Sequence, residues 1–239
     1  LRGARVTRAS TPLDVIEGRA RWCVVEGDAT DVLRSLQDGG VCAVITDPPY
    51  GIEWRGHAWD ADTPPQSVLS QCLRVATGGV LWFAGTTRIV GFGDYDPRPD
   101  RVIAWVPPFT VSGARSHGMR FHWDAVAVWR GSSRSSRVFA DVVRHDRARS
   151  ADADWSHGCT KPVRLMRDLV AAFSDDAEVV CDPFAGSGTT GVAALMEGRR
   201  VILVERDPVH VETCRRRCEE TEPGVGSRRA KQLVLGGVR

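Results

Sequence analysis

Short apolar runs alternate with segments of helical periodicity along this chain, and this alternation constrains the fold more than any other feature. The runs have the length and composition of buried strands, and the segments between them carry apolar side chains at helical spacing. The expected strands are residues 22–26, 41–46, 80–84, 102–106, 125–129, 178–182 and 201–205. The expected helices are residues 30–37, 68–76, 162–173, 189–197 and 208–220. Strands that alternate with helices predict an α/β fold with a largely parallel sheet.

Composition and charge describe one domain of ordinary size. The chain has 239 residues, of which 42% are hydrophobic and 26% are charged, and its net charge is +2. We expect a single domain over residues 21–222, a loose N-terminal tail over 1–20 and a flexible C-terminal tail over 223–239. The sequence has no run of 18 apolar residues and no signal peptide at its start, so we expect a cytoplasmic protein without a membrane span.

Seven cysteines bear on the redox compartment and on metal binding. Their number is odd, no Cys-x-x-Cys pair occurs, and several of them lie within the apolar runs expected to be strands. We therefore expect buried, reduced thiols rather than disulfides or zinc ligands. The sequence predicts no metal site.

Asp47-Pro48-Pro49-Tyr50 directly follows the expected strand at residues 41–46. Open α/β sheets place their chemistry at the carboxyl ends of strands. An exocyclic base amine is a poor nucleophile, and a carboxylate and a carbonyl that accept its two N–H bonds favour its reactive form. Asp47 offers the carboxylate, the stiff Pro48-Pro49 step offers a carbonyl, and Tyr50 offers a ring that stacks on the base. The four residues are candidate catalytic residues, and a proline-rich turn that ends a strand is the alternative.

A second motif runs from Asp182 to Gly191 and links an expected strand to an expected helix. Its glycines permit a tight turn and close approach of a ligand, and a helix N-terminus adds free N–H groups. A carboxylate at the end of the next strand can bind ribose hydroxyls. The candidate cofactor-binding residues of this region are Asp182, Phe184, Gly186, Ser187, Gly188, Thr189 and Glu205.

The glycine motif alone fits NAD as well as S-adenosylmethionine. The full Asp-Pro-Phe-Ala-Gly-Ser-Gly-Thr-Thr string is more specific than its glycines, and the motif at Asp47 has no role in hydride transfer. Both observations favour S-adenosylmethionine, because an amine clamp supplies a use for its methyl group. A nicotinamide dehydrogenase stays an alternative.

The middle of the chain is basic, with eight arginines and three acidic residues between positions 109 and 150. Arginine clusters contact the phosphates of nucleic acids, although a solvated surface loop has the same composition. We expect residues 107–156 to be an inserted segment that contacts DNA and recognises the target. The candidate DNA-binding residues are Arg55, Arg115, Arg120, Arg134 and Arg137. Arg55 lies among Trp54, His57 and Trp59, which could close over a base or pack into the core.

With both motifs in view, the chain resembles the DNA amino-methyltransferases of the N6-adenine/N4-cytosine family. It resembles the permuted, beta-class members, in which Asp-Pro-Pro-Tyr precedes the glycine motif. The resemblance covers roughly residues 21–106 and 120–220. It rests on residues 27–51, on the block 157–166, on residues 182–190 and on Glu205.

The resemblance implies a Rossmann-like, S-adenosylmethionine-dependent methyltransferase fold with a mostly parallel, seven-stranded and circularly permuted sheet. The strand at 22–26 would then lie beside the strand that ends at Glu205. It places Asp28 beside the cofactor's adenine, where the alternative is a helix cap. It places Lys161 near the methionine end, where the alternative is a surface lysine.

Two segments depart from the family pattern. The family's His-Pro-Thr-Gln-Lys-Pro block is replaced by His157-Gly158-Cys159-Thr160-Lys161-Pro162, and His122-Trp123-Asp124 stands where the family often has a His-Glu pair. Loss of the first proline of the block should loosen this loop. The first departure puts the contacts of Thr160 and Lys161 with the cofactor in question.

The resemblance implies a site-specific methyltransferase that acts on the N6 amine of an adenine flipped out of double-stranded DNA. An N4-cytosine enzyme is the nearest alternative. An RNA or protein-glutamine methyltransferase, or an inactive DNA-binding subunit, are more distant ones. The expected setting is a bacterial or phage-encoded protein, with a homodimer and a cognate restriction endonuclease as possible partners.

Overall fold

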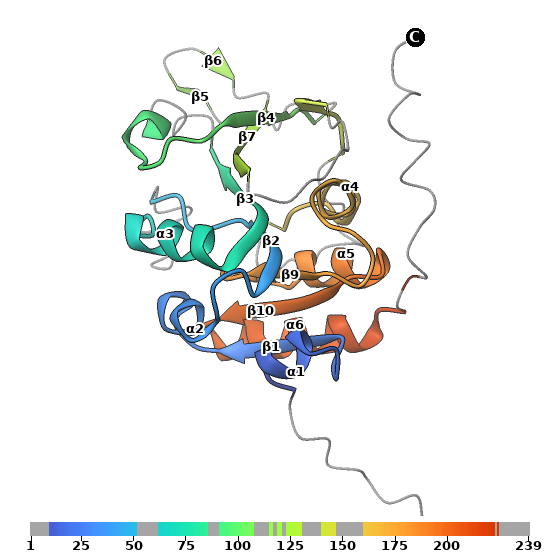
Figure 1. The fold of residues 1–239 in the computed structure, drawn as a ribbon. Coiled ribbons are helices and arrows are strands. Elements are labelled where there is room, and N and C mark those ends of the chain that lie inside the picture. Colours follow the sequence, from blue (N-terminus) through green and yellow to red (C-terminus); the bar gives the residue numbers. More distant parts are fainter. Residues whose placement is uncertain are drawn as a thin grey trace, which may run out of the picture.

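The structure of this chain is a computed structural model. It describes residues 10–51, 62–85, 91–107, 115–116, 119–120, 123–130, 140–146, 160–222 and 224. These residues form a central sheet with helices on both faces (Figure 1). The sheet confirms the expected α/β fold.

Eight strands build the main sheet, in the order β1-β10-β9-β2-β3-β7-β4-β8. They are β1 (Trp22–Glu26), β2 (Val41–Thr46), β3 (Ala76–Ala84), β4 (Arg101–Trp105), β7 (Asp124–Arg130), β8 (Val142–Val143), β9 (Val179–Asp182) and β10 (Arg200–Glu205). Only β7 runs antiparallel to its neighbours. A separate two-stranded sheet pairs β5 (Arg115–Ser116) with β6 (Met119–Arg120). The sheet is mostly parallel, as predicted, and has one strand more than predicted, because the two-residue β8 adds an edge.

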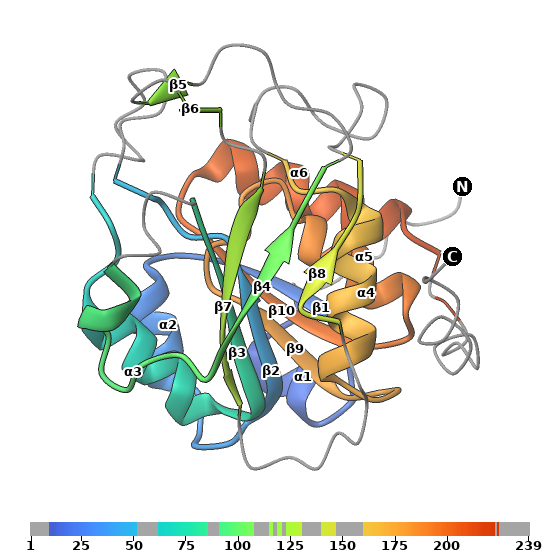
Figure 2. The ribbon, with the colours of Figure 1, turned by 90° about the horizontal axis from the view of Figure 1, so that it is seen from above.

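Six helices cover the two faces of the sheet: α1 (Pro12–Ile16), α2 (Ala29–Ser35), α3 (Gln66–Val75), α4 (Val163–Phe173), α5 (Thr189–Met196) and α6 (Pro208–Glu220). Buried side chains of α1, α2 and α3 share one core cluster, and those of α4, α5 and α6 share the other. Figure 2 shows α2 and α3 on one side of the strands and α4, α5 and α6 on the other. Burial on both faces explains why the central strands are continuous apolar runs.

Strand β1 lies beside β10 although the two are far apart in sequence. They pair in parallel from Trp22↔Val201 to Glu26↔Glu205. The N-terminal strand therefore supplies the position that the sequence predicted for it. Their carboxyl ends meet at one edge, where the Gly27 N–H donates to the Glu205 carbonyl over 3.0 Å.

The expectation that residues 1–20 form a loose tail was wrong for the described part. Residues Pro12–Ile16 form α1, and Thr11 and Asp14 make a reciprocal capping box at its start. Val15 is fully buried, and the Arg200 guanidinium donates to the Val15 carbonyl over 2.6 Å. The capping signal was present in the sequence as Thr-Pro-Leu-Asp, a pattern that fixes a helix start even in a short segment.

Strand β3 begins at Ala76, four residues before the expected strand at 80–84, and it includes Gly78 and Gly79. The register shifts there, with Val41 opposite Ala76 and Ala43 opposite Gly79. A Cβ on Gly78 would lie 2.9 Å from the Cys42 carbonyl oxygen. The glycine is thus required by the close approach of β3 to β2 at an irregularity in the strand pairing.

Segment 107–156 contributes to the sheet in addition to any recognition role. It contains β7, which lies between β3 and β4, and β8 at the edge. Arg115 and Arg120 face each other as a backbone pair in the β5–β6 hairpin. Positions 134 and 137 lie outside the described residues, as does Arg55 with its neighbours Trp54, His57 and Trp59.

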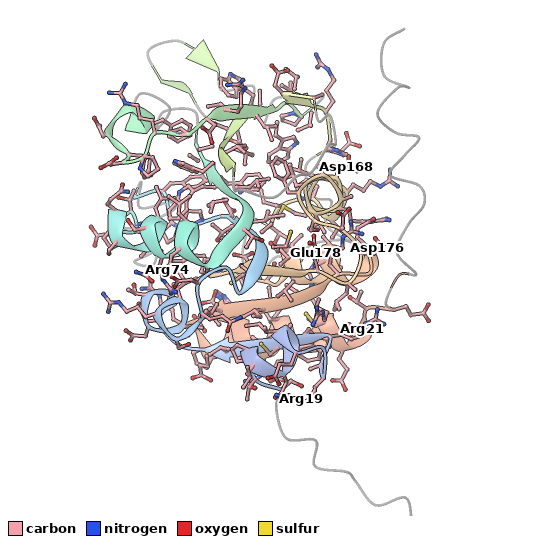
Figure 3. The ribbon with its side chains drawn as sticks, in the orientation of Figure 1. Arg19, Arg21, Arg74, Asp168, Asp176 and Glu178 are labelled. Carbon is pink, nitrogen blue, oxygen red and sulfur yellow. The ribbon has the colours of Figure 1, made fainter. Side chains whose placement is uncertain are left out.

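The side chain of Arg74 connects two helices at the surface. Arg74 on α3 donates to the Leu33 and Leu36 carbonyls at the end of α2, over 2.8 and 2.9 Å (Figure 3). Carbonyls at a helix end have few partners within the helix. Arg74 supplies a donor to both of these, in addition to the Leu36 N–H that the Leu33 carbonyl already accepts. The contact holds two consecutive helices together on the same face.

The six described cysteines are free thiols in the core, as predicted: Cys23, Cys42, Cys72, Cys181, Cys214 and Cys218. Burial raises the pKa of each of these thiols. Among the described residues, no three or more His, Cys, Asp or Glu side chains gather where they could hold a metal ion. No helix in the described part has the length and apolarity to cross a membrane.

Candidate active site

The predicted motifs meet at one edge of the sheet. The strands β1, β10, β9 and β2 are parallel neighbours, so their carboxyl ends lie side by side. Each of these strands ends at or just before an acidic residue: β1 before Asp28, β10 at Glu205, β9 at Asp182 and β2 before Asp47. The connection after β2 passes through α3 on one face, and the connection after β9 passes through α5 on the other. The gap between β2 and β9 is therefore the topological switch point, where open α/β sheets bind ligands.

Asp182 joins the two motifs below the surface. Its carboxylate accepts hydrogen bonds from the Thr46 hydroxyl at 2.7 Å, the Thr190 hydroxyl at 2.5 Å and the Phe184 N–H at 3.0 Å. Thr46 immediately precedes Asp47, and Thr190 lies in the first turn of α5. Burial, and to a smaller extent the nearby Asp47 charge, raise the pKa of Asp182 to about 6 against the opposing effect of the three hydrogen bonds.

The raised pKa of Asp182 makes a prediction about stability. The carboxyl group binds a proton more readily in the folded chain than in the unfolded chain, where its pKa has the ordinary value of 3.8. The free energy of unfolding therefore decreases as pH rises from about 4 to 6 and levels off above, by about 3 kcal/mol from this group. Asp182→Asn keeps the shape and lacks the titration. Urea unfolding at pH 4, 5, 6 and 7 should show the wild type losing stability relative to the variant across this window.

Parallel curves for the two proteins in that urea series would contradict the assignment. Thr190→Val is the matched control, since it removes one hydrogen bond to Asp182 and leaves its carboxyl to titrate. We expect that variant to keep the pH dependence, displaced to higher pH, because the lost bond had favoured the ionised form.

Gly186 and Gly188 shape the loop before α5. Both have positive φ, +51° and +81°, a conformation that side chains disfavour. Gly188 is the N-cap residue of α5, and its N–H donates to the Ala185 carbonyl over 2.8 Å. A Cβ on Gly186 would have no heavy atom within 4 Å, so one side of the loop faces open space. The loop thus presents backbone and a helix N-terminus to that space.

Ser187 and Thr189 point into the protein and are both buried. Arg217 of α6 donates to the Ser187 carbonyl at 2.6 Å and to the Ser187 and Thr189 hydroxyls at 3.0 and 3.3 Å. Cys214 on the same helix donates to the Gly186 carbonyl over 3.0 Å. The side of α6 that carries Cys214 and Arg217 therefore holds the loop from below. No sequence pattern pointed to Arg217, because its partners lie about thirty residues away in the chain.

Glu205 binds the same loop from the next strand. One carboxylate oxygen accepts the Gly186 N–H at 2.8 Å, and the other accepts the N–H groups of Arg206 and Asp207 at 2.9 Å. A carboxylate has about four acceptor positions, so Glu205 retains capacity for a ligand hydroxyl. Asp28 is exposed and caps α2 by accepting the Thr30 N–H at 2.8 Å. The helix-cap alternative for Asp28 is thus observed.

Phe184 extends from the loop over the next strand. It is partly buried, and its ring meets the Trp82 ring of β3 edge-on, with centroids 6.2 Å apart. Such edge-to-face contacts stabilise aromatic pairs. Phe184 therefore lies on the β3 side of the glycine loop, toward Asp47 rather than toward β1.

The Asp47 segment forms a compact polar group. The Tyr50 hydroxyl donates to Asp47 Oδ1 over 2.6 Å, and the Lys161 ammonium donates to Asp47 Oδ2. Lys161 also donates to the Tyr50 hydroxyl over 3.3 Å. Pro48 is buried and Pro49 is partly buried, so the pair anchors the segment at the end of β2. The structure thus places Lys161 against Asp47 and Tyr50, a contact that the sequence did not indicate.

These observations define a class. The sheet is mostly parallel, with a glycine loop at a helix N-terminus and an acidic residue at the end of the next strand. Together with the Asp-Pro-Pro-Tyr motif at the switch point, these features describe a Rossmann-like methyltransferase fold. Residues 115–216 match the sequence model of the DNA methylase family N6_N4_Mtase. This match spans less than half of the chain, and it confirms the resemblance to the N6/N4 DNA methylases that the sequence indicated.

Curated relatives are similar over most of the chain. It is 23% identical over 245 residues to the type II methyltransferase M2.MboI of Moraxella bovis, covering 84% of this chain and 88% of that protein. It is 25% identical over 247 residues to the DNA adenine methyltransferase YhdJ of Escherichia coli K12, covering 84% of each. Both alignments extend beyond the residues matched by the family model.

Solved structures share the fold. The PvuII DNA methyltransferase, described as cytosine-N4-specific, superposes with a TM-score of 0.66 at 16% identity, covering 83% of this chain and 86% of that one. The M1.HpyAVI–SAM complex superposes with a TM-score of 0.62 at 19% identity, covering 82% of this chain and 99% of that one. At these identities the likeness concerns the fold alone.

Proposed function

We propose that this chain transfers a methyl group from S-adenosylmethionine to the N6 amine of adenine in double-stranded DNA, at a specific sequence. One observation carries the proposal. The Asp47–Tyr50 clamp and the glycine loop adjoin across the switch point, joined through Thr46 and Asp182. Such a junction puts an amine acceptor beside a nucleoside-binding loop. The matching family model and the names of the relatives support the same activity.

The residues present fit the cofactor. The open space beside Gly186 admits a ligand against the backbone, and the acceptor capacity left on Glu205 suits ribose hydroxyls. Asp28, exposed after β1, is assigned to accept a hydrogen bond from the adenine amine, with the carboxylate oxygen that does not cap α2. Asp182, Ser187 and Thr189 support this cradle from within, with Gly188 setting the turn and Phe184 closing its far side. When bound, S-adenosylmethionine supplies an activated methyl group on a positively charged sulfur.

The clamp accounts for acceptance of the methyl group. The target base is flipped out of the duplex, because its amine is inaccessible within the stack. Asp47 and the Pro48 carbonyl accept the two amine N–H bonds, and Tyr50 stacks on the base. The amine nitrogen forms a bond to the methyl carbon as the carbon–sulfur bond breaks, and the nitrogen then releases one proton to solvent. With the cofactor bound, Asp47 and Tyr50 would orient the amine nitrogen toward its methyl group.

The choice of adenine rests on the resemblance, in which Asp at the first motif position is more often adenine-directed. One relative is named as an adenine methyltransferase, which supports this choice. The N4 amine of cytosine is the second candidate, since the matching family model is named for both N6 and N4 enzymes. Both amines present the same donor pair to Asp47 and Pro48.

The test is transfer of labelled methyl groups from S-adenosylmethionine to unmethylated genomic DNA, followed by digestion to nucleosides. We expect N6-methyladenine in double-stranded DNA and none in RNA incubated alongside. N4-methylcytosine without N6-methyladenine would overturn the choice of base. Label in RNA or protein instead of DNA would overturn the substrate, and binding of the cofactor without any transfer would indicate an inactive DNA-binding subunit.

The DNA contacts are also proposals. We infer that segment 107–156 contacts the phosphates of DNA through Arg115 and Arg120, which are paired in β5 and β6, and through Arg134 and Arg137, which lie outside the described residues. Arg55 would contact DNA from the loop after Tyr50. The homodimer, the restriction partner and the bacterial or phage origin stay predictions.

A further inference from the structure

Lys161 lies between the glycine loop and the Asp47–Tyr50 segment. It precedes Pro162, the N-cap residue of α4, and α4 packs against α5, the helix that follows the glycine loop. The neighbouring Thr160 hydroxyl lies 3.5 Å from the Ser187 hydroxyl of that loop. The Lys161 ammonium reaches the opposite way, to Asp47 and Tyr50. Two consecutive residues thus contact the glycine loop and the amine clamp.

The surroundings of the ammonium distinguish it from a surface lysine. The Lys161 side chain is only 12% exposed. Its nitrogen lies 5.1 Å from the centre of the Phe83 ring and 5.6 Å from that of Tyr50, within the range of cation–π attraction. A lysine so far removed from water needs a paired carboxylate, and Asp47 supplies it. The Lys161–Asp47 ion pair is therefore an internal contact of the Asp47–Tyr50 segment and not a surface contact.

Three groups close a ring of hydrogen bonds. The Tyr50 hydroxyl donates to one oxygen of Asp47, Lys161 donates to the other, and Lys161 also donates to the Tyr50 oxygen. Both carboxylate oxygens and the phenol are thereby fixed relative to one another. Each carboxylate oxygen accepts one of about two possible hydrogen bonds, so the carboxylate keeps capacity for an amine N–H. The ring of hydrogen bonds therefore orients the Asp47 carboxylate and leaves part of its acceptor capacity open.

We propose that Lys161 is a positioning residue for methyl transfer, which fixes the Asp47 carboxylate and the Tyr50 ring for the incoming base amine, rather than a ligand of the cofactor's methionine end. The assignment rests on the proposed function. It replaces the position that the resemblance implied for Lys161. Through Thr160, the same segment keeps this clamp in register with the glycine loop.

Three variants test the assignment. Lys161→Met keeps the length of the side chain and removes the charge, and Lys161→Arg keeps a charge that can reach Asp47. Arg164→Met removes an exposed charge from the first turn of α4, close to Lys161 in the chain. Turnover rate and KM for DNA are measured with labelled S-adenosylmethionine. Affinity for S-adenosylhomocysteine is measured by calorimetry, which also reports whether each variant folds.

We expect Lys161→Met to lower kcat about 100-fold, with affinity for S-adenosylhomocysteine within about twofold of the wild type. Lys161→Arg should recover a substantial part of the rate, and Arg164→Met should match the wild type. A tenfold loss of S-adenosylhomocysteine affinity with unchanged kcat would assign Lys161 to the cofactor. A lower KM for DNA with unchanged kcat would show that the Lys161 ammonium only competes with the base amine for Asp47. Either result overturns the proposal.

The wild type separates failure of this proposal from failure of the function beneath it. If the wild type methylates DNA and Lys161→Met does so equally well, the positioning role is refuted and the proposed function stands. If the wild type transfers no methyl group to any DNA, the proposed function is refuted, and the positioning role is refuted with it.

Discussion

We expect Asp47→Asn to lower the rate of methyl transfer roughly 10³-fold while affinity for S-adenosylhomocysteine stays within about twofold. Removal of one preorganised charged or polar group from a reacting centre has effects of this size. Asparagine has nearly the same shape, so the loss reports on charge and on acceptor capacity. The measurement is single-turnover transfer of labelled methyl groups to DNA at saturating protein.

Lys161 makes the asparagine substitution especially disruptive. In the wild type its ammonium donates to Asp47 Oδ2, and the pair is largely shielded from water. In Asp47→Asn the amide offers one oxygen and one NH₂ group, so either the ammonium or the base amine meets a donor instead of an acceptor. The double variant Asp47→Asn with Lys161→Met should be slower than the wild type by less than the product of the two single effects, because both act on one group.

Tyr50→Phe is the matched control for Asp47. It keeps the stacking ring and removes only the hydroxyl that donates to Asp47 Oδ1. We expect a loss of about tenfold, since the carboxylate keeps its contact with Lys161 and its charge. Equal rates for Asp47→Asn and the wild type would refute the role of the carboxylate, and a Tyr50→Phe variant as slow as Asp47→Asn would assign the chemistry to the phenol.

The sheet was predictable because its signal is local. The strands at residues 22–26 and 41–46 and the helix at 208–220 have the predicted bounds. In each case a continuous apolar run or a clear helical face fixes the element, and the parallel arrangement follows from their alternation. The pairing of β1 with β10 followed from the family resemblance.

The errors in the fold have local causes of another kind. Gly78-Gly79 has the composition of a turn, yet the backbone of β3 needs glycine to pass the Cys42 carbonyl. Such a requirement depends on the partner strand, which the sequence does not identify. The helix α1 was missed because five residues carry little periodicity, although its capping box was visible.

The motifs that meet at one edge of the sheet were predictable, and the contacts between them were not. Asp47, Asp182 and Glu205 were identified by motif, since each ends or follows a strand. The bond from Thr46 to Asp182 and that from Lys161 to Asp47 span more than a hundred residues. Arg217 supports the glycine loop from a helix that carries no motif. Contacts of this kind depend on how helices pack, and periodicity specifies the buried face without specifying the partner atom.

Gly188→Ala and Gly186→Ala should separate the two uses of the glycine loop. We expect Gly188→Ala to lower the free energy of unfolding by about 2–4 kcal/mol, measured by urea titration. Its φ of +81° costs a side chain about 1–2 kcal/mol. The new Cβ would also lie 3.0 Å from Cys214 Sγ and 3.1 Å from Cys214 Cα, and overpacking of a core costs about 1–3 kcal/mol.

Gly186→Ala carries the strain of positive φ without the collision, because its Cβ would have no heavy atom within 4 Å. We expect it to lose only about 1–2 kcal/mol of stability. Its methyl group would enter the space assigned to the cofactor, so affinity for S-adenosylhomocysteine should fall at least tenfold in calorimetry. If instead Gly186→Ala binds S-adenosylhomocysteine as the wild type does, the cofactor lies elsewhere. Equal losses of stability in the two variants would show that the Cys214 contact relaxes, since that contact alone distinguishes them on the protein side.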